Sequence, residues 1–203
     1  MKKLPTKYQK IYKENYIEYA GKNSIFRKIV SIFESWYHNQ ASSIYPSADK
    51  ILDVGSGSLF HLKFESNYKI YDIVEPKKYL LDNCPKELLK IQNYYENLKD
   101  IPIESKYDKI LSIMVLEHVE DLDLHLKLIS QKINNAGKFI VEISAQNDFL
   151  YWLSWRCSTG FIFWLKYRLD YGVLMNFERL NSYEKKLKTI KKYFLIIEKK
   201  AFP

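Results

Sequence analysis

A short apolar strand that ends in two closely spaced glycines constrains the fold of this chain more than any other sequence feature. Residues 50–54 (KILDV) are apolar apart from Lys50 and Asp53, and Gly55-Ser56-Gly57 follow at once. Glycine has no Cβ, so a backbone that turns here can pass close to a bound small molecule. Two glycines alone are weak evidence, because many turns contain them. The pattern becomes informative when an acidic residue follows at a suitable distance.

A second predicted strand, residues 68–75 (YKIYDIVE), supplies that acidic residue. Glu75 lies eighteen positions after Gly57. In nucleotide-binding βαβ units, an acidic residue about 20 positions beyond the glycine turn accepts hydrogen bonds from ribose hydroxyls. Asp72 competes for this role but lies in the middle of the strand, whereas Glu75 ends it. The alternative is that Glu75 only caps a helix over residues 77–84, and the position alone does not decide between the two.

Two further strands of the same kind are expected later in the chain. Residues 107–114 form an apolar run that leads into the loop 115–119 (VLEHV), and residues 138–144 follow a turn at 134–137. Between them, residues 122–133 have apolar side chains at the spacing of an amphipathic helix. Strands that alternate with helices are typical of a parallel sheet.

Together these segments resemble the class I S-adenosylmethionine-dependent methyltransferases. ILDVGSG is similar to the first motif of that family, and IVEP to the acidic end of its second strand. YDKILSIMVLEHVED resembles the fourth strand with its following loop, and NNAGKFIVEIS the fifth strand. The match covers residues 48–145 in the family's order. A dinucleotide-dependent dehydrogenase would more often have Gly-x-Gly-x-x-Gly, whereas position 60 here is Phe.

The resemblance implies a site for S-adenosylmethionine at the carboxyl ends of the strands. Asp53 would orient the first loop near the amino group of the methionine part, and Glu75 would hold the ribose hydroxyls. The end of the fourth strand would lie beside the methyl group. The cofactor-binding residues that the resemblance implies are Asp53, Gly55, Ser56, Gly57, Glu75, Pro76, Tyr95, Glu96, Ser112, Ile113 and Met114.

Two residues depart from the family's pattern. Leu59 stands where a third glycine is usual, and we expect it to shift the following helix slightly. Tyr94 stands where the family often has an Asp that reaches the adenine amino group, and a tyrosine is not an acceptor of the same reach. Tyr95 would instead stack on adenine, with Glu96 nearby.

The loop after the fourth strand holds the candidate catalytic residues. His118 has the ordinary pKa range of a general base, and Glu117 could orient or replace it. The alternative is that this Glu-His pair is structural or only contacts the cofactor. Some related quinone-pathway methyltransferases hold a divalent metal with a Glu-x-x-Glu-His cluster. Here Met114 occupies the first Glu position, so we predict no metal. His61 and His125 are expected to be isolated and exposed.

Composition restricts the partners of the chain. Its 203 residues, 47% of them hydrophobic, suffice for one domain with a sizeable core. The net charge of +8 could attract nucleic acid, a phosphorylated metabolite or an anionic membrane. The lysines are scattered, however, apart from residues 185–192, and no RNA-binding module is recognisable. We therefore expect a small-molecule methyl acceptor and no nucleic acid.

Cysteine usage and the apparent lack of targeting signals predict a cytoplasmic protein. Cys84 and Cys157 lie far apart and have no metal-ligand spacing, which favours a reducing compartment. Residues 1–10 are mostly polar and basic and contain no apolar run of the kind found in signal peptides. No stretch reaches the roughly 18 apolar residues of a spanning helix.

The two flanks of the strand region are expected to set substrate specificity. Residues 7–19 and 25–39 are predicted helices that cover the cofactor or simply pack on the sheet. In residues 149–171, nine of 23 residues are aromatic, and Arg156, Lys166 and Arg168 lie among them. Three interpretations stay open for this aromatic segment: a lid over an apolar pocket, which we favour, an element at a membrane surface, or a homodimer interface.

The sequence as a whole predicts an α/β, Rossmann-like three-layer sandwich around a mostly parallel sheet. We expect one domain with an N-terminal helical cap (1–47), a cofactor-binding core (48–145), an aromatic lid or insertion (146–180) and a last helix and strand (181–203). In the last part, Ser182 is the predicted N-cap of a helix over 182–192, and residues 193–199 are the predicted strand. The predicted function is S-adenosylmethionine-dependent methylation of a small molecule or biosynthetic intermediate, on oxygen. The alternatives are a non-catalytic subunit that binds a protein or membrane through residues 149–171, or an RNA methyltransferase.

Overall fold

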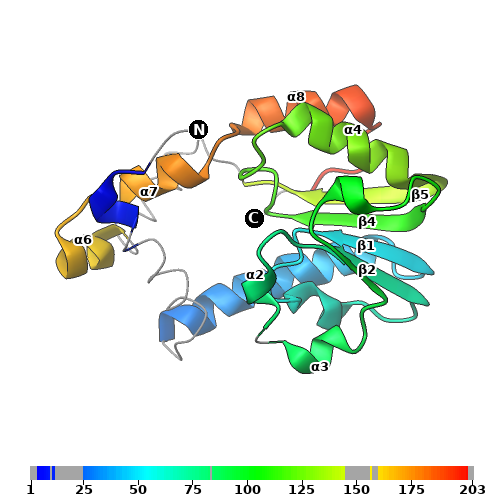
Figure 1. Ribbon diagram of the computed structural model, residues 1–203, viewed down its shortest axis with the longest axis horizontal. Coiled ribbons are helices and arrows are strands. Elements are labelled where there is room, and N and C mark those ends of the chain that lie inside the picture. The colour runs from blue at the N-terminus through cyan, green and yellow to red at the C-terminus, as the bar shows by residue number, and fades with distance from the viewer. Residues whose placement is uncertain are drawn as a thin grey trace.

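A five-stranded parallel sheet forms the centre of the protein (Figure 1), in a computed structural model that describes residues 4–9, 11, 25–82, 84–144, 156 and 160–200. The strands follow the order β3-β2-β1-β4-β5, and all neighbouring pairs are parallel. Their bounds are β1 Lys50–Val54, β2 Ile70–Val74, β3 Asn93–Tyr95, β4 Tyr107–Ile113 and β5 Ile133–Glu142. The chain leaves β1 in one direction toward β2 and β3 and returns to its other side as β4, so the strand order reverses at β1. In open α/β sheets, such reversal points are where ligands bind.

Helices cover both faces of the sheet and complete three layers (Figure 1). One face carries α4 (Leu122–Lys132) and α8 (Tyr183–Tyr193), and the other carries α2 (Ile25–Ile44). The short helical turns are η1 Phe60–Phe64, η2 Lys78–Leu80, α3 Pro85–Leu88 and η3 Leu98–Asp100. The predicted α/β three-layer fold is therefore confirmed.

Alternate residues of β1 enter two separate cores, one on each side of the sheet. Leu52 packs with Ile110, Leu126 and Ile190 under α4 and α8. Ile51 lies in the opposite core with buried residues of β2, β4, α2 and η1. Strands that are buried on both faces are apolar at nearly every position. This explains why β1, β2 and β4 appeared in the sequence as continuous apolar runs.

Side-chain caps fix the start of the two helices on the α4/α8 face. The Asp121 carboxylate accepts a hydrogen bond from Leu124 N at 3.0 Å, and Ser182 Oγ accepts one from Lys185 N at 3.3 Å. Such caps satisfy backbone N–H groups that have no partner within the helix. The predicted N-cap at Ser182 is confirmed.

Several predicted boundaries differ from the structure. The helix expected over 77–84 is not formed as one element: η2 covers only Lys78–Leu80, and α3 starts at Pro85, a residue that is favourable at the first helical position. The strand expected over 193–199 is not formed: Tyr193 ends α8, and residues 194–200 pair with no strand in the described part of the chain. An apolar run that pairs with no neighbouring strand gains no strand hydrogen bonds. Leu195 and Ile197, in this segment, are 87% and 70% exposed.

The fifth strand starts earlier than expected and carries an irregularity. Tyr107 pairs with Ile133, but Lys109 pairs with Lys138, so the predicted turn at 134–137 is an excursion inside β5. A Cβ on Gly137 would lie 2.9 Å from the Tyr107 carbonyl oxygen. Glycine is required at this position because the two backbones approach so closely.

A small third core lies apart from the sheet. It joins residues near the N-terminus to α6 (Phe161–Tyr167) and α7 (Tyr171–Glu178), with Leu4, Tyr8, Phe163 and Leu174 buried. Figure 1 shows α6 and α7 beyond one end of the strands, away from the two main cores. Most of the aromatic segment before α6 and residues 12–24 lie outside the described residues. The domain division and the lid stay predictions.

No helix among the described residues combines the length and the apolar content that crossing a bilayer requires.

Candidate functional site

The two glycines after β1 have positive φ angles and different surroundings. Gly55 has φ +74°, and a Cβ there would lie 2.4 Å from Cγ2 of Val115, in the loop after β4. Gly57 has φ +54°, and a Cβ there would meet nothing within 4 Å. The first glycine therefore allows the turn to pack on the neighbouring loop. The second leaves open space beside the backbone, where a ligand can approach.

Leu59, the non-glycine residue of the turn, also adopts a left-handed conformation, with φ +58°. This conformation costs a residue with a Cβ roughly 1–2 kcal/mol. The Leu59 side chain is only 2% exposed and belongs to the core on the α2 face. Full burial of a leucine contributes about 1.5–3 kcal/mol, which offsets the strain. The left-handed backbone thus keeps the turn in place without a third glycine.

The Glu75 carboxylate ties the glycine turn to the end of β2. Glu75 Oε2 accepts a hydrogen bond from Gly57 N at 2.8 Å, and Oε1 accepts one from Lys77 N, also at 2.8 Å. The residue is 5% exposed. A carboxylate offers about four acceptor positions, so capacity for two more donors, such as ribose hydroxyls, is left. The bond to Lys77 means that Glu75 also stabilises the backbone that follows the strand.

Asp53 and Asp72, the other carboxylates near the glycine turn, are bound to tyrosines inside the sheet. Tyr71 Oη donates to Asp53 Oδ2 at 3.0 Å, and burial raises the pKa of Asp53. Tyr107 Oη donates to Asp72 at 2.8 Å, and Asn93 Nδ2 donates to it at 2.9 Å. Asp72 is thus engaged in the middle of the sheet, which favours Glu75 as the ribose acceptor.

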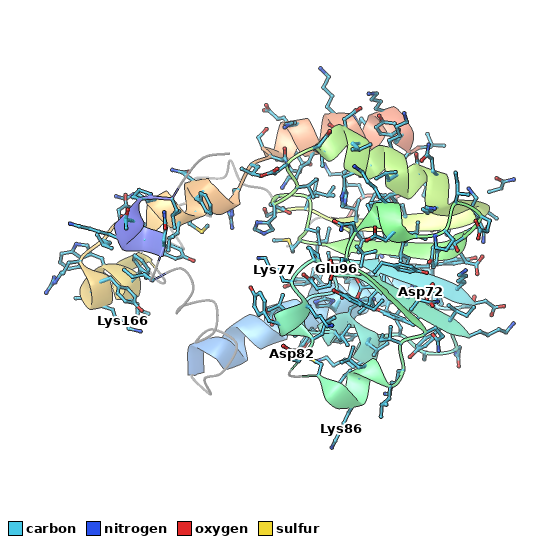
Figure 2. The ribbon with its side chains drawn as sticks, viewed as in Figure 1. Asp72, Lys77, Asp82, Lys86, Glu96 and Lys166 are labelled. Atoms are coloured by element: carbon cyan, nitrogen blue, oxygen red, sulfur yellow. The ribbon has the colours of Figure 1, made fainter. Side chains whose placement is uncertain are left out.

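At the end of β3, the two tyrosines point into different surroundings. Tyr94 Oη donates to the Glu75 carbonyl at 3.0 Å, so it braces the same strand end. Tyr95 packs on the α4/α8 core and hydrogen-bonds with Tyr107, and its stacking on adenine stays a prediction. Glu96 is exposed. Figure 2 shows Glu96 and Lys77 at the same edge of the sheet.

The end of β4 carries strained backbone and a buried hydroxyl. Met114 has φ +57°, an unfavourable conformation of the kind often found at functional sites. Ser112 is fully buried, and its Oγ has no hydrogen-bond partner among the described residues; the same holds for Ser56 Oγ beside the glycine turn. Each such buried group costs roughly 1–3 kcal/mol until a partner satisfies it. The edge thus offers unsatisfied polar groups to a polar ligand.

Glu117 is the centre of a buried polar cluster that holds the loop after β4. Lys186 Nζ, on α8, lies 2.6 Å from Glu117 Oε1, and Ser144 donates to the same oxygen through its N (2.8 Å) and Oγ (2.9 Å). Burial alone would raise the pKa of Glu117, but the hydrogen bonds from Lys186 and Ser144 outweigh it and lower the pKa. These contacts give Glu117 a structural function, and its predicted catalytic part stays a prediction.

His118 follows Glu117 and has an exposed side chain. Its backbone N donates to the Val115 carbonyl at 2.9 Å, which closes the turn. The role of His118 as a general base stays a prediction.

Sequence reasoning did not single out Glu142, the last residue of β5. Burial raises the pKa of Glu142 to about 7, with a further contribution from Glu117. Its Oε2 is buried and has no hydrogen-bond partner within the described ranges. A signal was present, because Glu142 interrupts an apolar strand near its carboxyl end much as Asp53 does in β1.

The expectation that His61 is isolated and exposed is wrong, and His125 is half-buried where it was expected to be exposed. His61 is 2% exposed and lies between His38 (Nδ1 to Nδ1, 2.9 Å) and Glu65 (2.8 Å), and Glu65 pairs with Lys109 Nζ at 2.7 Å. Burial, then the charges of His61 and Lys63, lower the pKa of His38 to about 3. Burial lowers the pKa of His125 to about 4. These networks join α2, η1 and β4 below the glycine turn.

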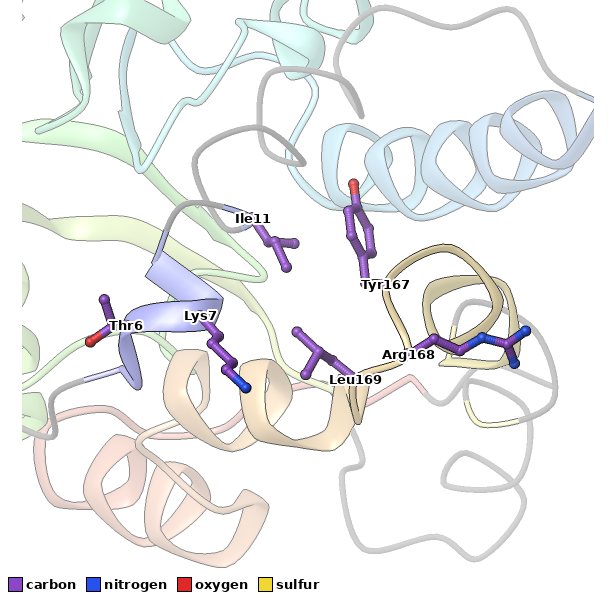
Figure 3. Close-up of a pocket in the computed structure, with 6 residues that line it drawn as sticks. All are labelled: Thr6, Lys7, Ile11, Tyr167, Arg168 and Leu169. Carbon is purple, nitrogen blue, oxygen red and sulfur yellow. The ribbon is translucent and has the colours of Figure 1, made fainter.

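A surface hollow of about 570 Å³ lies elsewhere, between the N-terminal residues and the α6–α7 connection (Figure 3). Its lining is Thr6, Lys7, Ile11, Tyr167, Arg168 and Leu169. None of these residues belongs to the sheet edge, so no part in the candidate site is assigned to it.

Comparison with known proteins identifies the fold. No protein-family model matches the sequence. A pavine N-methyltransferase of Thalictrum flavum subsp. glaucum is 28% identical over 109 residues, which are 50% of this chain and 31% of that enzyme. An O-methyltransferase family protein from Burkholderia thailandensis superposes with a TM-score of 0.60 at 12% identity, over 84% of this chain and 53% of the other. A further solved structure, a possible histamine N-methyltransferase from Thermotoga maritima, has a TM-score of 0.53 at 19% identity, over 83% and 78%. The chain has the class I methyltransferase fold.

The residues at the sheet edge fit the S-adenosylmethionine that this fold implies. The space beside Gly57 suits a ligand against the turn, and Glu75 retains acceptor capacity for ribose hydroxyls. The unpartnered hydroxyls of Ser56 and Ser112 suit a polar ligand between the ends of β1 and β4. The part of the chain that the structure describes contains no group of three or more metal-ligating side chains.

Proposed function

We propose that this chain is an S-adenosylmethionine-dependent methyltransferase that acts on a small molecule. The observation that carries the proposal is the Glu75 carboxylate, held 2.8 Å from the N–H of Gly57 at the reversal point of the class I fold. The matched region spans about a third of the curated relative's length. The similarity to that relative therefore does not show its activity for this chain, and methyl transfer is proposed here.

Each strand end contributes one part of the proposed cofactor site. Asp53, Gly55, Ser56 and Gly57 come from the β1 turn, and Glu75 binds the ribose. The remaining proposed contacts come from the ends of β2, β3 and β4: Pro76, Tyr95, Glu96, Ser112, Ile113 and Met114. When bound, S-adenosylmethionine supplies a methyl group activated by its sulfonium charge. The protein orients the acceptor, excludes water and removes a proton where needed, with His118 as the predicted base.

The acceptor atom is the finer part of the proposal. The sequence predicted oxygen, and the names of similar proteins include both N- and O-methyltransferases. Oxygen stays a prediction, and the carboxylates of Glu142 and Glu117 near the end of β4 favour nitrogen.

Isothermal titration tests the cofactor site directly. We expect S-adenosylhomocysteine to bind, and Glu75→Ala to weaken binding by about 10- to 100-fold, as the loss of hydrogen bonds to a charged group predicts. Glu104→Ala removes an exposed carboxylate from the loop before β4 and is the matched control. No binding of either S-adenosylmethionine or S-adenosylhomocysteine at millimolar concentration would contradict the proposal.

A second candidate function is binding of a partner or membrane surface by a non-catalytic subunit. The observation that favours it is the apolar surface of α6, where Phe161, Ile162, Trp164 and Leu165 are 46–58% exposed. Size-exclusion chromatography with light scattering distinguishes the two. A monomer that binds the cofactor and transfers methyl groups excludes the non-catalytic alternative.

A further inference from the structure

Glu142 lies beside the strand end that the proposed function assigns to the methyl group. It pairs in register with Ile113 of β4, and its carbonyl oxygen accepts a hydrogen bond from Met114 N at 3.1 Å. Residues in register on neighbouring parallel strands point to the same face of the sheet. Glu142 therefore shares the α2 face with Ile113, at the carboxyl edge.

One oxygen of the half-buried Glu142 carboxyl group has no partner. This atom, Oε2, is inaccessible to solvent and receives no hydrogen bond from the residues that the structure describes. A buried carboxylate oxygen without a partner is costly, and the cost is relieved either when the group takes up a proton or when a ligand donates to it. The raised pKa of Glu142, about 7, is the consequence of this burial.

The groups that face Glu142 make its surroundings acidic. From α2, the Tyr37 hydroxyl lies in the field of both Glu34 and Glu142, and burial together with these two carboxylates raises its pKa. From the loop after β4, Glu117 also acts on Glu142. The positive charge of Lys186, on α8, is directed at Glu117 Oε1. Glu117 Oε2 has no hydrogen-bond partner in the described part of the chain, although the residue is only 2% exposed.

Acidic surroundings in a chain with a net charge of +8 favour positive charge in a ligand. The carboxylates of Glu142 and Glu117 would repel an anionic acceptor, and a neutral alcohol would not compensate their charge. A protonated amine supplies both a positive charge and N–H donors, and it can satisfy the free oxygen of Glu142.

We propose that Glu142, in place of the predicted base His118, binds the amino group of a cationic methyl acceptor and takes its proton, so that this enzyme methylates nitrogen. The inference rests on the proposed function. In the step, an N–H bond of the ammonium group breaks and an O–H bond forms on Glu142. The freed nitrogen lone pair then forms the bond to the methyl carbon, while the carbon–sulfur bond of the donor breaks and its electron pair stays on sulfur.

A carbon NMR titration tests the binding part without knowledge of the natural acceptor. The side-chain carboxyl carbons of glutamate are labelled with ¹³C, and the Glu142 signal is assigned by its loss in Glu142→Gln. The probes are ethylamine and ethanol at equal concentration. Each carries only the reacting group and a short alkyl chain, so the test does not depend on the structure of the rest of the natural acceptor. We expect ethylamine to lower the pKa of Glu142 by about one unit, a tenfold coupling, and ethanol to leave it unchanged. Equal pKa values with the two probes would overturn the inference.

Methyl transfer from radiolabelled S-adenosylmethionine to a panel of amines and matched alcohols tests the catalytic part. We expect amines to be the accepted compounds, and Glu142→Gln to lower kcat/KM by about 10²-fold or more, the contribution of a general base. Glu104→Gln is the control and should retain activity. Methylation of alcohols alone, or an unchanged rate in Glu142→Gln, would overturn the inference.

Cofactor titration separates failure of this inference from failure of the proposed function. Glu142→Gln should bind S-adenosylhomocysteine as tightly as the unmodified chain, because Glu142 lies on the acceptor side. If no variant binds the cofactor, the proposed function fails. If all bind it and Glu142 does not respond to ethylamine, only the inference about nitrogen fails.

Discussion

The two halves of the sheet's carboxyl edge are built in different ways. In the β1–β2 half, the polar contacts run between backbone N–H groups and Glu75, over a separation of eighteen residues. In the β4–β5 half, Glu117 depends on Lys186, 69 residues further along the chain. The first half satisfies both oxygens of its carboxylate, whereas the second leaves one oxygen of Glu117 and one of Glu142 unpartnered within the described residues. The first half is therefore the part that we propose binds the cofactor, and the second is the part that we propose binds the methyl acceptor.

The largest difference between the halves should appear when their central carboxylates are removed. Glu117→Ala leaves Lys186 buried and unpaired, and we expect the free energy of unfolding to fall by about 3–5 kcal/mol. Glu75→Ala removes bonds at a strand end and should cost less, about 1–3 kcal/mol. Urea denaturation of both variants measures this. Equal losses in the two variants would contradict the view that only the β4–β5 half depends on a buried ion pair.

The two glycines of the β1–β2 half should differ in how much a substitution by alanine lowers stability. Gly55→Ala forces a Cβ against Val115 in a left-handed backbone, and we expect a loss of about 2–4 kcal/mol of stability. Gly57→Ala should cost only about 1–2 kcal/mol, because nothing lies near its Cβ.

The two glycine variants should rank in the opposite order when cofactor affinity is measured instead of stability. The methyl group of Gly57→Ala enters the space assigned to the cofactor, so that variant should lose more affinity for S-adenosylhomocysteine than Gly55→Ala. Thermal unfolding and titration calorimetry on the same two proteins give both rankings, and a single common ranking would contradict the assignment.

The pH dependence of stability isolates Glu142 in the second half. The pKa of Glu142 is about 7 in the folded state, compared with an ordinary glutamate value of 4.5, which we take for the unfolded chain. Between these values the folded chain binds the proton and the unfolded chain does not, so this group makes stability fall as pH rises from about 4.5 to 7. Because the Glu142 carboxyl group is partly accessible to solvent, we expect the free energy of unfolding to fall by only about 1–2 kcal/mol over that pH range. Glu142→Gln should lose this part of the slope, measured as the difference between the two urea-unfolding curves; an identical slope would contradict the burial argument.

The sequence was sufficient for the features that depend on neighbours in the chain. The apolar strands at 50–54 and 107–113, the helix that starts at Leu122 and the cap at Ser182 all follow from local pattern, and all are present. The acidic end of β2 was recognisable because Glu75 and the glycine turn are separated by a nearly fixed interval.

The features that depend on distant partners were not predictable. Glu117 was interpreted as a catalytic candidate because the residue that neutralises it, Lys186, lies on a helix at the far end of the chain. His61 was expected to be exposed because one of the residues that enclose it, His38, lies 23 positions earlier in the chain, on α2. Residues 194–200 have the composition of a strand, but composition does not report whether a segment pairs with a sheet, and here it pairs with no strand in the described part of the chain.

The position of β1 at the middle of the sheet has a consequence for how the protein folds. β2 and β3 follow β1 closely, and the three strands can pair as soon as residues 50–95 are available. The partner on the other side, β4, begins much later, and the Lys50–Asp108 contact at its start spans 58 residues. Closing so long a loop is slow, so one edge of the buried strand β1 stays open in the meantime. During synthesis, this open edge of β1 is therefore where the nascent chain is most exposed to mispairing with another copy.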